Sequence, residues 1–94
     1  NLQTYDSPEK VAGMDKIKQK LTSFGFNTKI VNGHSIPQLI KVMKNTPFNK
    51  GRPSAIICNT IKGKGISFAE NNKNWHHKSS ISIDDLNLIE KELQ

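Results

Sequence analysis

The chain has 94 residues, of which 34% are hydrophobic and 6% aromatic, so it amounts to one small domain at most. No apolar run reaches the roughly 18–20 residues of a membrane-spanning helix, and we therefore expect a protein without a membrane segment. The single cysteine, Cys58, excludes an internal disulfide framework and a cysteine-based zinc site, and it fits a reducing, cytoplasmic compartment.

The formal net charge of +6 is unevenly distributed along the chain. Between Lys16 and Ala69 there are ten basic residues and no carboxylate. A stretch of this kind favours an anionic partner, either a nucleic acid or a phosphate compound. A lysine-rich solvated surface explains the same charge equally well, so charge alone leaves both interpretations open.

The first predicted element is a helix that begins at Pro8. Ser7 is its expected N-cap, Pro8 suits the first helical position, and Glu9 places an acid in the first turn. Gly25 is the expected C-terminal stop. Apolar residues recur at helical spacing throughout the segment, namely Val11, Met14, Ile17, Leu21 and Phe24. The pattern therefore predicts one helix up to Gly25.

A strand and a second helix are predicted next. The strand is the segment Phe26–Val31, which is rich in β-forming residues and ends at the turn dipeptide Asn32-Gly33. Ser35 then begins a helix, with Gln38 three residues later as the partner in a capping box. Its apolar stripe consists of Ile36, Leu39, Ile40 and Met43.

The remaining elements are a strand, a long loop and a last helix. The run Ser54–Thr60 is almost continuously apolar, which is typical of a strand buried on both faces of a parallel sheet. A polar loop extends from Lys62 to Ser80, and Ser82 caps the last helix. This helix carries Leu86, Ile89 and Leu93.

The order helix, strand, helix, strand, loop, helix predicts a βαβ unit of an α/β fold. Two strands do not make a stable doubly wound domain, because a buried parallel strand needs neighbours on both sides. We therefore expect residues 1–94 to be part of a larger α/β domain and not an independent domain. The first residue, Asn1, is not an initiator methionine, which agrees with sequence lying upstream.

The loop after the second strand is the first candidate site. Ligands in open α/β sheets bind beyond the carboxyl ends of the strands, and Ile61-Lys62-Gly63-Lys64-Gly65 lies there. Glycine lets a backbone approach an anion closely, and lysine supplies positive charge. A plain glycine turn with exposed lysines is the more frequent explanation of such a motif. The spacing is not that of a P-loop, so we discard nucleoside triphosphate hydrolysis.

The second candidate is Trp75-His76-His77-Lys78, in a polar loop. A loop histidine can act as an acid or base, hold a phosphate or bind a metal, but adjacent histidines do not converge on one ion. His34 is expected to fix its turn by hydrogen bonds. Asp84 and Asp85 are expected to serve the N-terminus of the last helix, and Cys58 to be a buried, inert thiol.

These motifs together resemble the transketolase family, specifically the C-terminal third of its thiamine diphosphate-binding half. Phe24-Gly25-Phe26 resembles the family's "FGW" junction, and Ile30–Ser35 is similar to "VDGHD/S". Pro53–Ile66 resembles "KPTxIIAKTIKGKGV", and Glu70–His76 resembles part of "ENNxxWHGKAP". Each motif is weak alone, but four of them in the family's order make a chance match improbable.

The resemblance implies a three-layer, parallel-sheet domain that binds thiamine diphosphate and Mg²⁺ or another divalent cation. It implies transfer of a two-carbon ketol unit between sugar phosphates in carbohydrate metabolism, as in the pentose phosphate route. By position, Lys62 and Gly63 correspond to residues beside the cofactor. His76 corresponds to a catalytic histidine that contacts both the diphosphate and the substrate. Leu2 corresponds to the residue whose backbone carbonyl binds the metal.

The resemblance also implies partners, and the sequence departs from the family motifs at a few positions. The glutamate that activates the cofactor belongs to a separate pyrimidine-binding half or subunit, and the halves associate into a dimer of halves, a heterotetramer when they are separate chains. The sequence departs from the family at His77, which replaces a glycine, at Ser79-Ser80, which replaces Ala-Pro, and at Asn32, which replaces an aspartate. The bulkier His77 bears on which sugars are used.

Two other interpretations remain beside the enzyme. One is a catalytically degenerate relative that keeps the fold as a scaffold. The other is a basic module that binds RNA or DNA. Nucleic-acid modules interleave exposed aromatics with basic residues, and here Trp75 is the one plausible stacking residue. We therefore expect neither a nucleic-acid partner nor a membrane partner.

Overall fold

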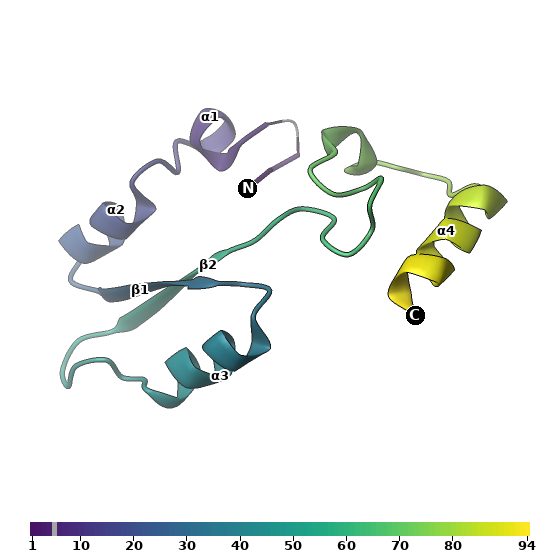
Figure 1. Cartoon of the computed structure of the whole chain (residues 1–94). Helices are drawn as coiled ribbons and strands as arrows, with labels where there is room; N and C mark the ends of the chain where they lie inside the picture. The colour runs from purple at the N-terminus through teal and green to yellow at the C-terminus, as the bar shows by residue number, and fades with distance from the viewer. Residues whose placement is uncertain (5) are drawn as a thin grey trace. The chain divides into compact units, whose positions relative to one another are not determined.

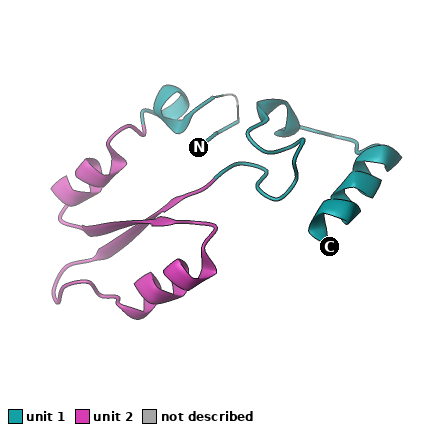
Figure 2. Cartoon of the chain, viewed as in Figure 1, with its two compact units in different colours: residues 1–13, 61–94 teal, residues 14–60 magenta. Residues whose placement is uncertain are grey.

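The computed structural model describes residues 1–4 and 6–94. In chain order its elements are the helices and strands α1 (Pro8–Ala12), α2 (Ile17–Ser23), β1 (Asn27–Asn32), α3 (Ile36–Lys44), β2 (Ser54–Asn59), the 3-10 helix η1 (Lys73–Trp75) and α4 (Ile83–Leu93) (Figure 1). They form two compact units, residues 14–60 and residues 1–13 with 61–94 (Figure 2).

The unit of residues 14–60 contains the predicted βαβ arrangement. β1 and β2 pair in parallel, from Asn27 opposite Ser54 to Asn32 opposite Asn59. Backbone hydrogen bonds from Asn27 to Pro53 and from Gly33 to Asn59, at 2.9 and 2.8 Å, extend the pairing at both ends. α3 is the connection between the strands, and both α2 and α3 pack on β1. The α/β class predicted from the order of elements is confirmed.

The single helix predicted from Pro8 to Gly25 is wrong, because α1 and α2 are separate helices. Gly13 adopts a left-handed conformation with φ +59° and donates its N–H to Glu9, which closes α1. Lys16 is also left-handed, with φ +53°, and precedes α2. A left-handed residue cannot continue a right-handed helix. The apolar residues keep their helical spacing on both sides of Gly13, so their pattern did not reveal the break between the two helices.

The start of α3 has half of the predicted capping box. The Ser35 hydroxyl accepts a hydrogen bond from the backbone N–H of Gln38 at 3.4 Å, as expected for an N-cap. The Gln38 side chain, however, accepts a hydrogen bond from the backbone N–H of Asn32 at 3.1 Å. This contact ties the end of β1 to the first turn of the helix that follows it.

The hydrophobic core of the described residues is small. Val42, 6% exposed, is the one buried hydrophobic residue among them. β2 is half-buried over its first four residues, and Cys58 and Asn59 at its end are exposed. The expectations of a strand buried on both faces and of a buried Cys58 thiol are therefore wrong. Within the described residues the sheet has two strands, so β2 has a strand neighbour on one side only.

The other unit combines the N-terminal residues, the polar loop and α4. Ser82 caps α4 as predicted, with a full capping box in which Ser82 and Asp85 exchange hydrogen bonds of 3.1 Å. Hydrogen bonding of its carboxylate to Ser82 holds the pKa of Asp85 below its ordinary value. None of the helices in the described part of the chain is long and apolar enough to cross a membrane.

Candidate functional site: a glycine loop with a lysine–histidine pair

The glycine motif after β2 forms a loop that folds back on itself. Backbone hydrogen bonds from Lys64 to Ile61 and from Ile66 to Gly63, at 3.2 and 3.1 Å, make two successive turns. Gly63 has φ +72°, and a Cβ atom at this position would lie 2.4 Å from the backbone oxygen of Ala69. The close approach of these two backbone segments therefore requires glycine at position 63.

The backbone of Lys62 is held on both sides. Its N–H donates a hydrogen bond to the Asn1 side-chain oxygen at 2.8 Å, and its carbonyl accepts one from the N–H of Asn71 at 3.0 Å. The Asn1 side-chain amide also donates to the side-chain oxygen of Asn71. The first residue of the chain thus contacts the loop that carries the candidate lysine.

The two candidate side chains, Lys62 and His76, lie in direct contact. Nζ of Lys62 is 2.6 Å from Nδ1 of His76. A lysine ammonium group donates hydrogen bonds and cannot accept them, so Nδ1 must accept. The proton of the neutral imidazole ring is then on Nε2. His76 consequently presents an N–H donor on the side of the ring that faces away from Lys62.

The pKa of His76 is lowered from its ordinary value of 6.5. Partial desolvation is the largest cause, and the positive charges of Lys62 and His77 add to it. Each of these effects disfavours the imidazolium form. His76 is therefore neutral at physiological pH, in agreement with the hydrogen bond that its Nδ1 accepts.

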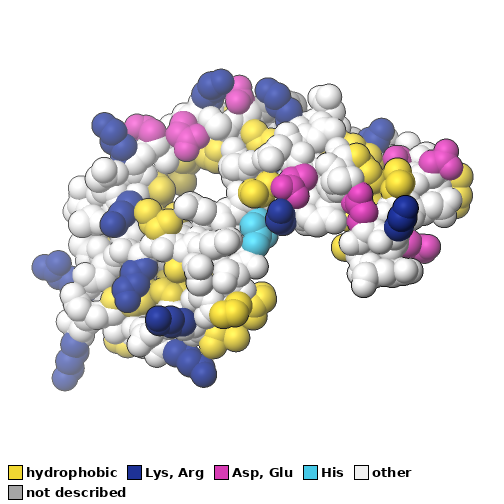
Figure 3. All heavy atoms as spheres, in the orientation of Figure 1, with side chains coloured by type: hydrophobic (Ala, Val, Ile, Leu, Met, Phe, Trp, Pro, Cys, Tyr) yellow, Lys and Arg dark blue, Asp and Glu magenta, His cyan; other side chains and the backbone are white. Residues whose placement is uncertain are grey.

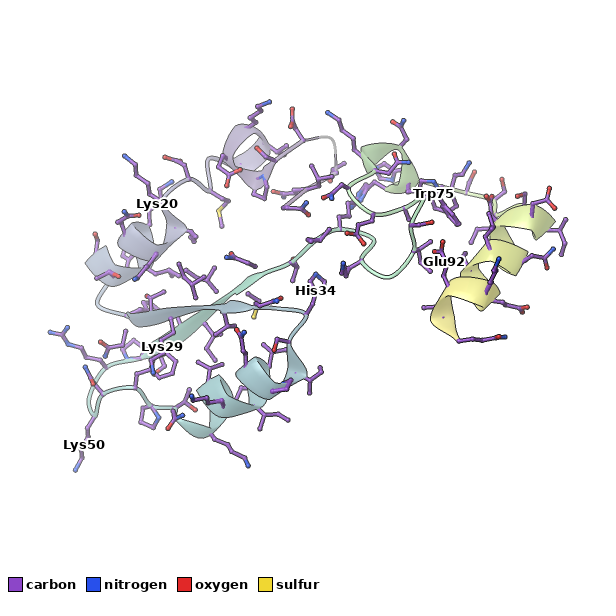
Figure 4. All side chains as sticks on the ribbon, in the orientation of Figure 1. Lys20, Lys29, His34, Lys50, Trp75 and Glu92 are labelled. Atoms are coloured by element: carbon purple, nitrogen blue, oxygen red, sulfur yellow. The ribbon has the colours of Figure 1, made fainter. Side chains whose placement is uncertain are left out.

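An aromatic cluster supports the turn that precedes His76. Trp75 is the last residue of η1 (Figure 4), and its ring centroid lies 4.8 Å from that of Phe68. The Lys78 ammonium group lies 5.2 Å from the Trp75 ring centroid, a cation–π contact. The rings of His76 and His77 meet edge to face at 4.3 Å. Trp75 is thus a packed residue of this loop, and it places His76 at the end of η1.

The second lysine of the glycine motif has a different partner. Nζ of Lys64 lies 3.3 Å from both carboxylate oxygens of Glu70, so its charge is compensated within the loop. Lys62 is therefore the lysine of this motif that contacts a candidate catalytic side chain. From the residues alone, Lys62 and Lys64 were predicted as equivalent sources of positive charge. Only the family resemblance distinguished Lys62 from Lys64.

The remaining candidates from the sequence are His34, at the turn after β1, and Leu2, the expected metal ligand. The backbone N–H of His34 donates a 2.9 Å hydrogen bond to the Asn32 side chain, so the turn is hydrogen-bonded as expected. Leu2 is half-buried. Its role as a metal ligand stays a prediction. Within residues 1–4 and 6–94, no group of three or more His, Cys, Asp or Glu side chains is arranged to hold a metal ion.

Sequence reasoning missed three residues of this site: Asn1, Asn71 and Glu92. Asn1 and Asn71 bind the Lys62 backbone, as described above. Glu92 of α4 accepts hydrogen bonds from the backbone N–H of Ser67, at 2.7 Å, and from its hydroxyl group. The sequence has no local signal for these contacts, because 61 and 25 residues separate Asn1 from Lys62 and Ser67 from Glu92.

Comparison with known proteins shows which proteins the chain resembles. No family model matches the chain. A stretch of 65 residues, 69% of the chain, is 38% identical to human transketolase and covers 10% of that protein. The chain is a relative of the transketolases. Over 76 residues it is also 29% identical to one of the subunits of the apulose-4-phosphate transketolase of Phocaeicola vulgatus, with 81% of the chain and 27% of that protein covered.

A third transketolase relative supports the same relationship. The 6-deoxy-6-sulfo-D-fructose transketolase subunit SqwG of a Clostridium species is 31% identical over 62 residues, which are 66% of the chain and 22% of that protein. The chain thus spans about a tenth to about a quarter of the length of these transketolases. The resemblance drawn from the four sequence motifs is confirmed.

Proposed function

We propose that residues 1–94 are the C-terminal segment of the thiamine diphosphate-binding domain of a transketolase-type enzyme, with the three-layer architecture of that domain. The enzyme transfers a two-carbon ketol unit between sugar phosphates. The observation that carries this proposal is the contact between Lys62 and His76 on a glycine loop, in a chain related to transketolases. This is the pair that the family resemblance selects as cofactor-binding and catalytic.

The donor groups of the loop fit a diphosphate. The Lys62 ammonium group and the Nε2–H of His76 are both donors, and hydrogen bonds from such groups to phosphate oxygens are short and strong. Gly63 lets the loop that carries Lys62 pack closely against the backbone of Ala69, where a Cβ atom would clash. When bound, thiamine diphosphate supplies the nucleophilic carbon that takes up the ketol unit. We assign Lys62, Gly63 and His76 to cofactor binding.

His76 has a second role in this proposal. A neutral imidazole whose Nδ1 accepts from Lys62 can donate a hydrogen bond from Nε2–H to an oxygen of the substrate. It can pass this proton on if Nδ1 takes up a proton from the Lys62 ammonium group in the same step, and the reverse transfer restores both groups. With this relay the ring stays neutral before and after the transfer, in agreement with its lowered pKa. His76 is therefore proposed as the catalytic and substrate-binding residue of this segment. The Leu2 carbonyl is proposed as a ligand of Mg²⁺, which prefers oxygen donors.

The names of two relatives support the proposal that this protein has a partner subunit. Two of the relatives are named as subunits of transketolases. We propose that a pyrimidine-binding half or subunit completes the active site of this protein and that the halves associate into a dimer of halves in the cytoplasm. The compounds named for the two relatives are a sugar phosphate and a sulfo-sugar, so the proposal names no individual sugar and keeps to sugar phosphates, the class that the family resemblance implies.

The test is the replacement of His76 by alanine in the complete enzyme with both halves present. We expect kcat/KM for ketol transfer to fall by about 10²–10⁴, the range for the loss of a positioned acid–base group. His77→Ala is the matched control, because His77 is the adjacent histidine and the 2.6 Å contact with Lys62 is made by Nδ1 of His76. Near-normal turnover of His76→Ala together with a loss in His77→Ala would contradict the assignment.

The same experiment separates the enzyme from a catalytically degenerate scaffold. A scaffold gives no ketol transfer with any sugar phosphate, with or without His76. His77→Gly restores the residue that the family has at this position, and we expect it to change which acceptor sugar is preferred. Unchanged acceptor preference in His77→Gly would show that this departure from the family has no bearing on specificity.

A further inference from the structure

The backbone of Lys62 lies in a closed set of three hydrogen bonds. Asn1 accepts from the Lys62 N–H at 2.8 Å, Asn71 donates its backbone N–H to the Lys62 carbonyl at 3.0 Å, and the side chains of Asn1 and Asn71 are bonded to each other. We refer to Asn1 and Asn71 as the asparagine clamp. Both polar groups of the Lys62 main chain are occupied by it.

Asn71 has the properties that this position demands. Its φ of +58° is in the left-handed region, where asparagine is several-fold enriched over other non-glycine residues. This backbone conformation directs its N–H to Lys62 while its side chain contacts Asn1. Glycine would provide the conformation but not the side chain, and alanine would provide neither. Asparagine meets both requirements at once.

We propose that Asn71, together with Asn1, is a positioning residue that sets the direction in which the Lys62 side chain extends to His76. A lysine side chain has four rotatable bonds, and only its root can be fixed by the main chain. Clamping the root on both sides restricts where Nζ can lie, and Nζ is 2.6 Å from His76 Nδ1. A displacement of about 1 Å at such a group is enough to impair a site.

The proposal rests on the proposed roles of Lys62 and His76, but its first test does not need the cofactor. In the complete protein with labelled histidine, nuclear magnetic resonance measures the pKa of His76 directly. The Lys62→Met variant removes the ammonium group, which should raise this pKa because the Lys62 charge helps to lower it. The shift in Lys62→Met therefore defines the full effect of losing a well-placed Lys62.

The decisive variant is Asn71→Gly, which keeps the left-handed backbone and removes only the side chain. If the clamp positions Lys62, the pKa of His76 should shift upward, toward the value in Lys62→Met. Asn1→Ala should shift it in the same direction, and the double variant should shift it by less than the sum, because both substitutions open one hydrogen-bonded unit. Asn1→Ala leaves the backbone of Asn71 unchanged, so it remains informative if Asn71→Gly disturbs the loop.

Asn74→Ala is the matched control, since Asn74 is an exposed asparagine of η1 three residues after Asn71, and alanine preserves a helical backbone. It should leave the pKa of His76 unchanged. A wild-type pKa of His76 in both Asn71→Gly and Asn1→Ala would overturn the proposal, as would a shift of equal size in Asn74→Ala.

A second measurement distinguishes failure of the clamp from failure of the proposed function. In the complete enzyme, Asn71→Gly should weaken the apparent affinity for thiamine diphosphate by about tenfold, in the range for groups that orient ligating residues, with kcat at saturating cofactor largely retained. A shifted His76 pKa with unchanged cofactor affinity supports the clamp and contradicts cofactor binding by Lys62. An unshifted pKa overturns the clamp at any affinity.

Discussion

Gly63 and Gly65 lie in the same loop with positive φ angles of +72° and +101°, but only Gly63 is crowded. A Cβ atom on Gly63 would lie 2.4 Å from Ala69, whereas nothing lies within 4 Å of one on Gly65. We predict that Gly63→Ala costs the backbone strain of about 1–3 kcal/mol and a clash besides, while Gly65→Ala costs the strain alone. Thermal unfolding of the complete protein measures both. Equal losses would contradict the role assigned to the Ala69 contact.

The lowered pKa of His76 predicts how cofactor binding depends on pH. A bound diphosphate favours the imidazolium form, so it raises the pKa of His76 relative to the free protein. Binding then takes up a proton, and affinity should rise as pH falls through the pKa of His76 in the complex toward its lower pKa in the free protein. Calorimetric titration with thiamine diphosphate measures this. His76→Asn should lose the part of the pH dependence that is not due to the diphosphate itself.

At the level of single residues, the sequence predicted the members of the site better than their environment. Lys62, Gly63 and His76 were found because their spacing resembles a family motif, and the structure brings Lys62 and His76 into contact. Their roles stay predictions. The environment of Cys58 was predicted wrongly, because an apolar run indicates a strand but not how many neighbours cover it.

At the level of elements, α4 is attached to the glycine loop through one carboxylate. Glu92 accepts two hydrogen bonds from Ser67, and these hold its pKa below the ordinary 4.5. A lowered carboxyl pKa stabilises the folded state above the unfolded value and loses that contribution as pH falls through the folded one. We therefore predict that α4 becomes more mobile as pH falls below about 4.5.

Amide hydrogen exchange at Ser67 measures this attachment in the complete protein. Glu92→Gln should raise the exchange rate at Ser67 near neutral pH and remove most of its acid dependence. Glu90→Gln, two residues earlier on the same helix, is the control and should leave Ser67 unchanged. Protection of Ser67 that is the same in Glu92→Gln and the wild type would contradict the role of Glu92.

The elements themselves were predictable where local chemistry decides them. Ser82 with Asp85 and the parallel pair β1–β2 follow from capping residues and apolar runs. The break between α1 and α2 was not predictable in this way, because the left-handed conformation of Gly13 leaves the spacing of the apolar residues in the sequence unchanged. The Gln38 contact to Asn32 was missed for a related reason, since a capping box and a contact to the preceding strand use the same residue types.

At the level of the whole molecule, the apolar residues of the described chain are poorly covered. Val42 is buried, while Phe24, Ile36 and Ile83 are 81, 64 and 70% exposed. Hydrophobic burial is the dominant stabilising contribution to folding, so a chain with this core gains little from it. We predict that residues 1–94 expressed alone show no cooperative thermal transition. A sharp melt with strongly protected amides would contradict this.

The basic stretch from Lys16 to Ala69 gives a further prediction for the whole protein. Lys and Arg side chains are scattered over the face seen in Figure 3, and Lys20 and Lys50 of the basic stretch point away from the sheet (Figure 4). Three others, Lys18, Lys29 and Lys41, line a cavity of about 450 Å³, which is in the size range of small-molecule sites. We therefore predict that the complete protein does not bind oligonucleotides.

Filter binding at several salt concentrations checks this prediction. A nucleic-acid module loses affinity steeply with salt, with a logarithmic slope of about 0.9 for each phosphate contact. Binding below about micromolar concentration at physiological salt, with such a slope, would favour the basic module over the enzyme.

The position of Trp75 has an optical consequence. It is the single tryptophan of residues 1–94, its indole packs on Phe68 beneath the Lys78 ammonium group, and the next residue is His76. Fluorescence of this indole senses the charges and the solvent around it, so emission should change when an anion reaches the neighbouring imidazole. The loop thus contains an intrinsic fluorophore one residue from the proposed catalytic side chain, and ligand titrations on this segment need no added dye.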